Sequence, residues 1–199
     1  MLLNVFTDRM RMGLFGGSFD PVHLGHLLAA RAAREEAGLD RLFFIPAAQS
    51  PFKPAAQPAP APERLRWLRL ALAGEATAEV DDQEIRRGGL SYTIDTVRDY
   101  ARKYPVAELF YLIGADQTAQ LRLWREAAEL ARLVQFLIIP RPGEVLSELD
   151  PPFRGRALRG VPLGVSSSEI RARLKAGLPV THLTPPAVAE ALGNNRLYL

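Results

Sequence analysis

The fold is decided by the stretch Met12–His26, which reads MGLFGGSFDPVHLGH. Residues Met12–Phe15 are apolar and suit a buried strand, two glycines follow, and a helix-forming segment begins at Leu24. A strand, a glycine-rich turn and a helix in this order form the first half of a βαβ unit. In open α/β sheets the turn after such a strand lies where ligands bind.

The same alternation of short apolar runs and longer amphipathic stretches continues along the chain. Further strands are predicted at 42–45, 78–81, 109–113, 134–139 and 157–161. Helices are predicted at 24–37, 63–73, 92–103, 119–133, 167–176 and 186–192. This order predicts a doubly wound, Rossmann-like α/β fold, with a parallel sheet of five to six strands, helices on both faces and a C-terminal helical tail. The prolines between 46 and 62 predict a long loop.

Composition excludes several classes of protein. A chain of 199 residues without cysteine has no disulfide, no thiolate zinc site and no cysteine nucleophile. It has no apolar run long enough for a membrane span, and the charges at Asp8, Arg9 and Arg11 make its start a poor signal peptide, so we expect a cytoplasmic protein. A net charge of +3 is too small to indicate nucleic-acid binding. Residues 1–10 precede the first strand and are predicted to be an extension, with Met10 and Met12 as alternative starts.

The turn after the first strand carries groups suited to a phosphate. Gly16 and Gly17 allow the backbone to approach one closely, and the helix that follows offers free N–H groups. His23 and His26 share one face of that helix, where both can donate to the same phosphate. A plain turn would also explain the glycines, and capping or packing would explain the histidines. The pair does not indicate zinc, because the chain has one other histidine and no cysteine.

A second candidate phosphate site is the segment 165–171, VSSSEIR, at a predicted helix start. Serine hydroxyls and free N–H groups there can bind an anion, and Arg171 adds a cation one turn further on. An ordinary N-cap followed by a surface arginine is the alternative.

These segments together resemble a known group of enzymes. The string GGSFDPVHLGH (16–26) resembles the nucleotide-binding motif of the nucleotidyltransferase superfamily that carries His-x-Gly-His, and VSSSEIR resembles its Ile-Ser-Ser-Thr-x-Ile-Arg motif. Three further segments resemble the bacterial nicotinate-nucleotide adenylyltransferases: SYTIDT (91–96), LIGAD (112–116) with Leu121 and Trp124 after it, and PAAQSPFK (46–53). In the last of these, Phe52 stands where the family usually has histidine.

The resemblance implies one nucleotidyltransferase domain over residues 1–199, with 165–199 as a C-terminal helical subdomain. It implies transfer of the adenylyl group of ATP to nicotinate mononucleotide, which gives nicotinate adenine dinucleotide and pyrophosphate in NAD biosynthesis. ATP and nicotinate mononucleotide are the expected partners, and Mg²⁺ is expected to be carried by the ATP phosphates without a metal site of the protein. The alternatives are an adenylyltransferase for nicotinamide mononucleotide or phosphopantetheine, a cytidylyltransferase, and a nucleotide sensor without turnover. The oligomeric state is left open.

The resemblance also assigns candidate site residues. Catalytic roles are expected for His23, His26, Lys53 and Arg171. ATP is expected to contact Gly16, Gly17, Ser18, Phe19, Gly25, Gly114, Asp116, Ser167 and Ser168. The mononucleotide is expected to contact Asp20, Thr93, Trp124 and Arg141.

Several of these residues have a structural alternative. Asp116 can accept the hydroxyls of a ribose or cap the next helix, and Thr93 can bind the pyridine carboxylate or cap its own helix. Trp124 can stack on a pyridine ring, which is worth about 0.5–1.5 kcal/mol beyond its buried area, or fill the core. Lys53 can fold over a phosphate or remain solvated in its loop. Asp20 can orient a ligand or stabilise the turn that contains it.

Overall fold

A computed structural model describes residues 9–52, 57–141, 149–160, 163–195 and 197–198. Within them, six parallel strands form one sheet in the order β3-β2-β1-β4-β5-β6. The strands are β1 (Arg11–Gly17), β2 (Arg41–Pro46), β3 (Ala78–Val80), β4 (Glu108–Gly114), β5 (Gln135–Ile139) and β6 (Gly155–Ala157). The strand order reverses between β1 and β4, and in doubly wound sheets this is the point where the ligand crevice opens. The predicted fold class is confirmed, with six strands.

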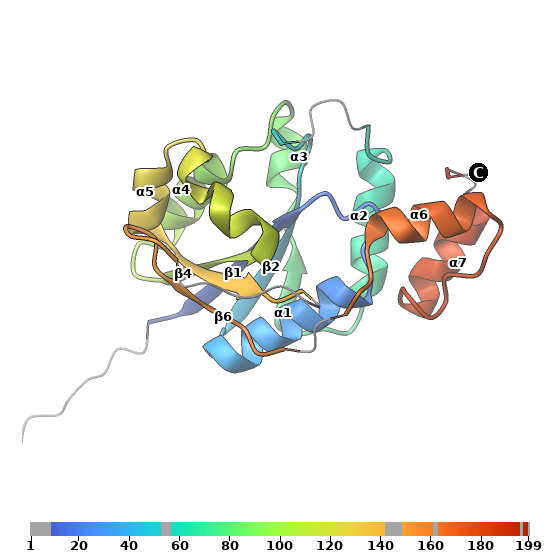
Figure 1. The fold of residues 1–199 in the computed structure, drawn as a ribbon, viewed down its shortest axis with the longest axis horizontal. Helices are drawn as coiled ribbons and strands as arrows, with labels where there is room; N and C mark the ends of the chain where they lie inside the picture. The colour runs from blue at the N-terminus through green and yellow to red at the C-terminus, as the bar shows by residue number, and fades with distance from the viewer. Residues whose placement is uncertain (1–8, 53–56, 142–148, 161–162, 196, 199) are drawn as a thin grey trace, which may run out of the picture.

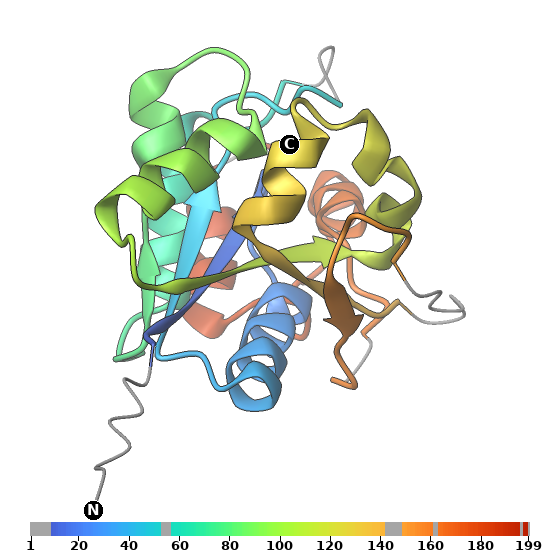
Figure 2. The same ribbon diagram turned by 90° about the vertical axis from the view of Figure 1, so that its left-hand side faces the viewer.

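Helices cover both faces of the sheet. They are α1 (Leu24–Ala37), α2 (Ala61–Ala71), α3 (Gln83–Arg87), α4 (Thr93–Lys103), α5 (Ala127–Leu133), α6 (Ser167–Lys175) and α7 (Pro186–Asn194), with a 3₁₀ helix, η1 (Ala115–Leu123). In Figure 2 the blue helix α1 and the yellow helix α5 lie on opposite sides of the sheet. None of the described helices is long and apolar enough to cross a membrane.

Each central strand sends alternate side chains to two separate cores. In β2, Leu42 and Phe44 pack with α1, α2 and α7, whereas Phe43 and Ile45 pack with α4, η1 and α5. Because both faces are buried, the strands read as continuous apolar runs without polar alternation. This pattern identified the central strands in the sequence.

The last two helices join the first of these cores. In α7, Val188 and Leu192 are buried together with Trp67 and Leu68 of α2, and Ile170 of α6 is fully buried in the same cluster. Figure 1 shows α6 and α7 side by side next to α2, at the edge of the molecule away from β4 and α5. The C-terminal tail therefore packs on the sheet domain, as the sequence predicted, and carries α6 toward the end of β1.

Some predicted boundaries are wrong. Gly16 and Gly17 are the last two residues of β1, paired with Ile45 and Pro46, and do not begin the loop. Helix α2 begins two residues earlier than expected, at Ala61, because proline is tolerated in the first turn of a helix.

The second half of the chain differs in three places. In place of the strand expected at 157–161 the structure has β6, Gly155–Ala157, which begins two residues and ends four residues earlier. The segment 119–133, expected to hold one or two helices, contains the end of η1 and all of α5, and Glu126 between them has a φ of +52°. The short helix α3 was not predicted, since five residues are too few for a periodic pattern.

Candidate active site

A cleft of about 1920 Å³ opens at the carboxyl ends of β1 and β4. It is lined by the loops after β1, β2, β4 and β5 and by the start of α6. The structure brings together in this cleft every predicted site residue that it describes: Gly16, Gly17, Ser18, Phe19, Asp20, His23, Gly25, His26, Thr93, Gly114, Asp116, Trp124, Arg141, Ser167, Ser168 and Arg171. Lys53 lies outside the described residues.

Close neighbours limit the space for a side chain at the two glycines that end β1. A Cβ at Gly16 would overlap the hydroxyl of Tyr111, and a Cβ at Gly17 would lie 3.2 Å from the ring of Phe19. The Phe19 ring is buried under the loop, next to Phe15 and Phe44. Any contact of Phe19 with a nucleotide is therefore expected to come from its backbone.

Arg64 of α2 holds the loop after β1 in place, and the sequence analysis did not predict this role. Its Nη1 donates to the carbonyls of Ser18 and Ala47, at 2.8 Å each, and its Nε donates to the carbonyl of Ala59 at 2.9 Å. The residue is only 1% exposed. One buried guanidinium thus joins the loop after β1 to the segments on both sides of the residues 53–56. Arg64 lies on the buried face of its helix, three and four residues before Trp67 and Leu68. A charged residue at an apolar position of the helical pattern was the feature of the sequence that could have indicated a buried role.

The two histidines at the start of α1 stack on one another. Their ring centroids are 3.7 Å apart with the planes inclined by 28°. Nδ1 of His26 accepts the backbone N–H of His23 at 3.2 Å, so a neutral His26 ring carries its proton on Nε2. His23 is 7% exposed, and within the described part of the chain its Nδ1 has no hydrogen-bond partner. This nitrogen is itself buried, so it is an unsatisfied polar atom within the wall of the cleft.

Both imidazoles are neutral near pH 7. Burial, followed by the charge of Arg141, lowers the pKa of His23 to about 4. Burial, followed by His23 and Arg141, lowers the pKa of His26 well below its usual value. The pair therefore offers N–H donors without fixed charge, while Arg141 supplies the positive charge beside them.

The unliganded protein is expected to lose stability as the pH falls from about 6.5 toward about 4. His23 has a pKa of about 4 when folded and 6.5 as an ordinary histidine, so the unfolded chain takes up the proton first. Protonation then favours unfolding, whereas above pH 6.5 the effect vanishes. Urea unfolding between about pH 7 and about pH 5 measures this slope, and His23→Gln should flatten it. Equal slopes in the two proteins would contradict the assignment.

The start of α6 is bonded directly to the loop after β1. Ser166, the N-cap, accepts the N–H of Glu169 at 3.1 Å, and the hydroxyl of Ser167 donates to the carbonyl of Pro21 at 2.9 Å. Nη1 of Arg171 donates to the carbonyl of Asp20 at 2.7 Å. The two segments predicted to bind phosphate therefore form one connected wall of the cleft.

Asp20 lies at the centre of this junction. Its Oδ1 accepts the N–H of Ala59 at 3.0 Å and the hydroxyl of Tyr198 at 2.5 Å, and its Oδ2 lies 3.6 Å from Nη1 of Arg171. The side chain is 11% exposed. These contacts favour the structural alternative for Asp20 over direct contact with a mononucleotide.

An aromatic wall forms the side of the cleft next to α4 and η1. Trp124 packs edge-on against Tyr111 and Phe136, so it belongs to the core, and it also lines the cleft. The ring of Phe52 lies 5.9 Å from that of Trp124 and is 52% exposed. Thr93 is the first residue of α4, not its cap, and its hydroxyl donates to that of Tyr111 at 3.3 Å.

The end of β4 carries an ion pair. Asp116 lies in η1 and its Oδ1 is 3.2 Å from Nη2 of Arg141, which follows β5. A Cβ at Gly114 would overlap that carboxylate oxygen. Gly114 thus makes room for the pair, and Asp116 does not cap the helix.

A buried acid, Glu84 of α3, supports the segment that contains Thr93. Its carboxylate accepts the hydroxyl of Thr96 at 2.5 Å, and Arg87 donates to the same hydroxyl at 2.9 Å. Burial raises the pKa of Glu84. Ser91 accepts the N–H of Ala48 at 2.9 Å, which fixes this segment to the loop after β2. The role of Glu84 was not predicted, although it lies within a segment that the family resemblance covers.

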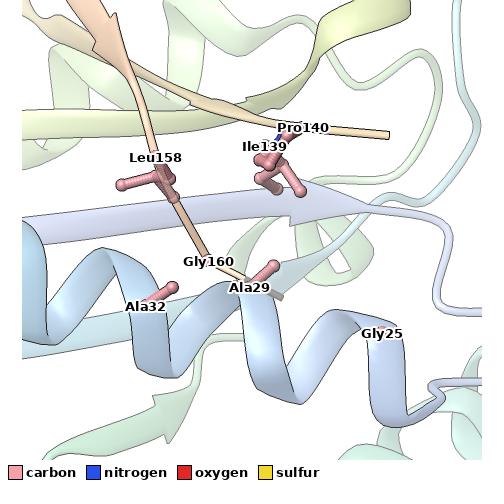
Figure 3. A pocket seen from close by; sticks show the side chains of 7 residues that line it. All are labelled: Gly25, Ala29, Ala32, Ile139, Pro140, Leu158 and Gly160. Carbon is pink, nitrogen blue, oxygen red and sulfur yellow. The ribbon is translucent and has the colours of Figure 1, made fainter. Parts of the chain in front are cut away.

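A small hollow of about 20 Å³ lies beside the first turn of α1 (Figure 3). Gly25 and Ala29 of α1 line it together with Ile139 and Pro140, and these four residues also line the large cleft. A Cβ at Gly25 would lie 3.0 Å from Nδ1 of His23. Small residues on this face of α1 therefore leave space next to the imidazoles.

Comparisons with known proteins agree with this geometry. Residues 14–173 match the family described as cytidylyltransferase-like. A probable nicotinate-nucleotide adenylyltransferase of Opitutus terrae is 42% identical over 191 residues, which cover 95% of this chain and 98% of that protein. A protein of the same name from Thermus thermophilus is 42% identical over 194 residues, covering 95% of this chain and 100% of that protein.

The fold is shared with a solved structure. The nicotinic acid mononucleotide adenylyltransferase of Plasmodium falciparum, complexed with NaAD, has a TM-score of 0.81 to this chain, covers 96% of it and 98% of its own length, and is 16% identical. The family match spans most of the chain, and the two bacterial relatives align over nearly all of it. The chain therefore belongs to the nicotinate-nucleotide adenylyltransferases, within the cytidylyltransferase-like family.

Proposed function

We propose that this protein transfers the adenylyl group of ATP to nicotinate mononucleotide and releases pyrophosphate. The observation that carries the proposal is the junction of the two phosphate segments. Ser167 and Arg171 are hydrogen-bonded to the loop after β1, and the cleft beside them has an aromatic wall that suits a pyridine ring. The names of the bacterial relatives support the same reaction.

The triphosphate is proposed to lie along the wall formed by α1 and α6. The histidines contact the α- and β-phosphates through N–H groups, and Arg171 with Ser167 and Ser168 contacts the β- and γ-phosphates. The backbone of Gly16, Gly17 and Ser18 is proposed to lie alongside the phosphates and to contact them. The N–H of Leu24 donates to the carbonyl of Leu183 at 3.0 Å and the N–H of His26 to the carbonyl of His23 at 2.9 Å, so among the first three residues of α1 only Gly25 is proposed to offer its N–H to a phosphate.

The reaction needs no general base. The 5′-phosphate of the mononucleotide is an anion at neutral pH, and its oxygen attacks the α-phosphorus in line. A new P–O bond forms as the bond to the bridging oxygen of pyrophosphate breaks, and that oxygen takes the negative charge. Catalysis then depends on positioning and on donors to the departing pyrophosphate, without a covalent intermediate.

Mg²⁺ is proposed to enter with ATP and to neutralise charge on its phosphates. The acids of the cleft already have partners: Asp20 with Tyr198, Asp116 with Arg141 and Glu84 with Thr96. In the described parts of the chain, no group of three or more His, Asp or Glu side chains is arranged around a metal position. Such a cleft fits a cation held by phosphate oxygens and water.

The pyridine ring is proposed to lie against Trp124 and Phe52, with its carboxylate near the start of α4 at Thr93. Replacing Phe52 by alanine should raise KM for nicotinate mononucleotide by about 2- to 10-fold, the loss expected for one aromatic contact. KM for ATP should not change. Initial rates at varied concentration of each substrate separate the two effects. Val106→Ala removes another exposed apolar side chain, outside the cleft, and is the matched control.

The reaction is tested by product analysis. Purified protein with ATP, Mg²⁺ and nicotinate mononucleotide should form nicotinate adenine dinucleotide and pyrophosphate in equal amounts, measured by mass spectrometry and a pyrophosphate assay. Omission of the mononucleotide should stop pyrophosphate release. ATP binding without a dinucleotide product would favour the nucleotide sensor.

A further inference from the structure

Tyr198, from the far end of the sequence, contacts the loop between β1 and α1. Its hydroxyl donates to Oδ1 of Asp20 at 2.5 Å, across 178 positions. Its ring lies 6.0 Å from that of Trp67, within the core cluster that includes α2 and α7. Tyr198 is half-buried, it lines the cleft, and neither the sequence motifs nor the proposed mechanism assigns it a role.

The contacts of Asp20 divide its carboxylate into two parts. Oδ1 accepts from both Tyr198 and the N–H of Ala59, whereas Oδ2 lies 3.6 Å from Nη1 of Arg171, beyond hydrogen-bond distance. That Nη1 donates instead to the backbone carbonyl of Asp20, at 2.7 Å. A free carboxylate and a guanidinium prefer a two-pronged pair with two parallel hydrogen bonds. Arg171 is held beside Asp20 without forming that pair.

We propose that Tyr198 is a positioning residue for the triphosphate site: by occupying Oδ1 of Asp20, it keeps the 3.6 Å ion pair of this carboxylate with Arg171 from closing into a two-pronged hydrogen-bonded pair. The guanidinium then remains available to the β- and γ-phosphates and to the departing pyrophosphate. The inference rests on the proposed function, because it takes ATP as the ligand of Arg171.

The chemistry of the tyrosine suits this role. Burial, followed by the hydrogen bond to Asp20, raises the pKa of Tyr198, so the hydroxyl keeps its proton and stays a donor. Without the hydroxyl, Oδ1 would retain only the N–H of Ala59, and the carboxylate could turn both oxygens toward Arg171. A hydrogen bond from a neutral donor to a carboxylate is strong enough to decide between two such arrangements.

The test is direct binding of ATP·Mg²⁺ and of pyrophosphate by calorimetry, without the mononucleotide. Tyr198→Phe should weaken both by about 3- to 10-fold, the loss of part of one charge-assisted hydrogen bond. KM for nicotinate mononucleotide should stay unchanged. Tyr104→Phe removes a hydroxyl outside the cleft and should bind both ligands as the wild type does.

A second background separates positioning from a loss of stability. With Asp20→Asn the carboxylate that could form a two-pronged pair with Arg171 is removed, so adding Tyr198→Phe should leave the Kd for ATP unchanged, even if the melting temperature falls. An equal loss of affinity in both backgrounds would overturn the proposal, as would wild-type affinity in Tyr198→Phe. Failure of the wild type to bind ATP at all would instead contradict the proposed function.

Discussion

Replacing His26 by alanine is expected to lower turnover by about 100-fold or more, the usual cost of losing one donor to a developing oxyanion. Nδ1 of His26 is occupied by the N–H of His23, which leaves Nε2–H as the donor toward the cleft. Because burial keeps the ring neutral, this loss should not depend on pH around neutrality. Steady-state kinetics at saturating ATP and mononucleotide measure the loss in kcat.

The control for this variant is the third histidine of the chain. His182 is exposed and does not line the cleft, so His182→Ala should keep the wild-type kcat. Circular dichroism and the melting temperature show whether His26→Ala is folded. A folded His26→Ala protein with turnover near that of the wild type would contradict the role given to this residue.

Replacing Arg64 by alanine is expected to destabilise the protein by about 3–5 kcal/mol, the range for removing one partner from a buried charged network. The carbonyls of Ser18, Ala47 and Ala59 would lose their donor inside the protein. For a domain of this size the change corresponds to a fall in melting temperature of about 6–20 °C. Urea unfolding measures the free energy directly, and ATP binding should weaken because the loop at Ser18 loses its anchor.

Arg66 provides a matched comparison on the same helix. Its side chain is 58% exposed and lies 3.9 Å from Glu63, a weak surface pair. Arg66→Ala should therefore change the free energy of unfolding by less than about 1 kcal/mol. Equal effects of the two substitutions would show that Arg64 is not the anchor of the loop.

The sequence predicted the fold because its strands are buried on both faces. Apolar runs such as Leu109–Ile113 need no tertiary information to be recognised, and Gly16 and Gly17, which end β1, mark the approach to the turn into α1. The histidine pair was also predictable, since two residues three apart at a helix start must share a face. Their stacked rings confirm that geometry.

The residues that hold the site together could not be predicted in the same way. Arg64 and Tyr198 contact partners far away in the sequence. Every residue has a backbone carbonyl, so the amino-acid type at Ser18 does not show that its carbonyl accepts a hydrogen bond from Arg64. For Asp20 the sequence left two roles open, contact with a ligand and stabilisation of its turn, and its carboxylate is engaged by protein groups. The motif residues therefore predicted where the cleft lies, whereas the residues that hold these motifs in place, Arg64 and Tyr198, could be found only from tertiary contacts.

The most direct test of the account is pyrophosphate release from ATP and Mg²⁺ with three acceptors in parallel: nicotinate mononucleotide, nicotinamide mononucleotide and phosphopantetheine. We predict kcat/KM for nicotinate mononucleotide at least about tenfold above that for the amide, because a site that binds the carboxylate leaves polar groups unpaired with the analogue. Phosphopantetheine should give no release. Release with phosphopantetheine alone, equal rates with the two pyridine nucleotides, or no release with any acceptor would contradict the assignment.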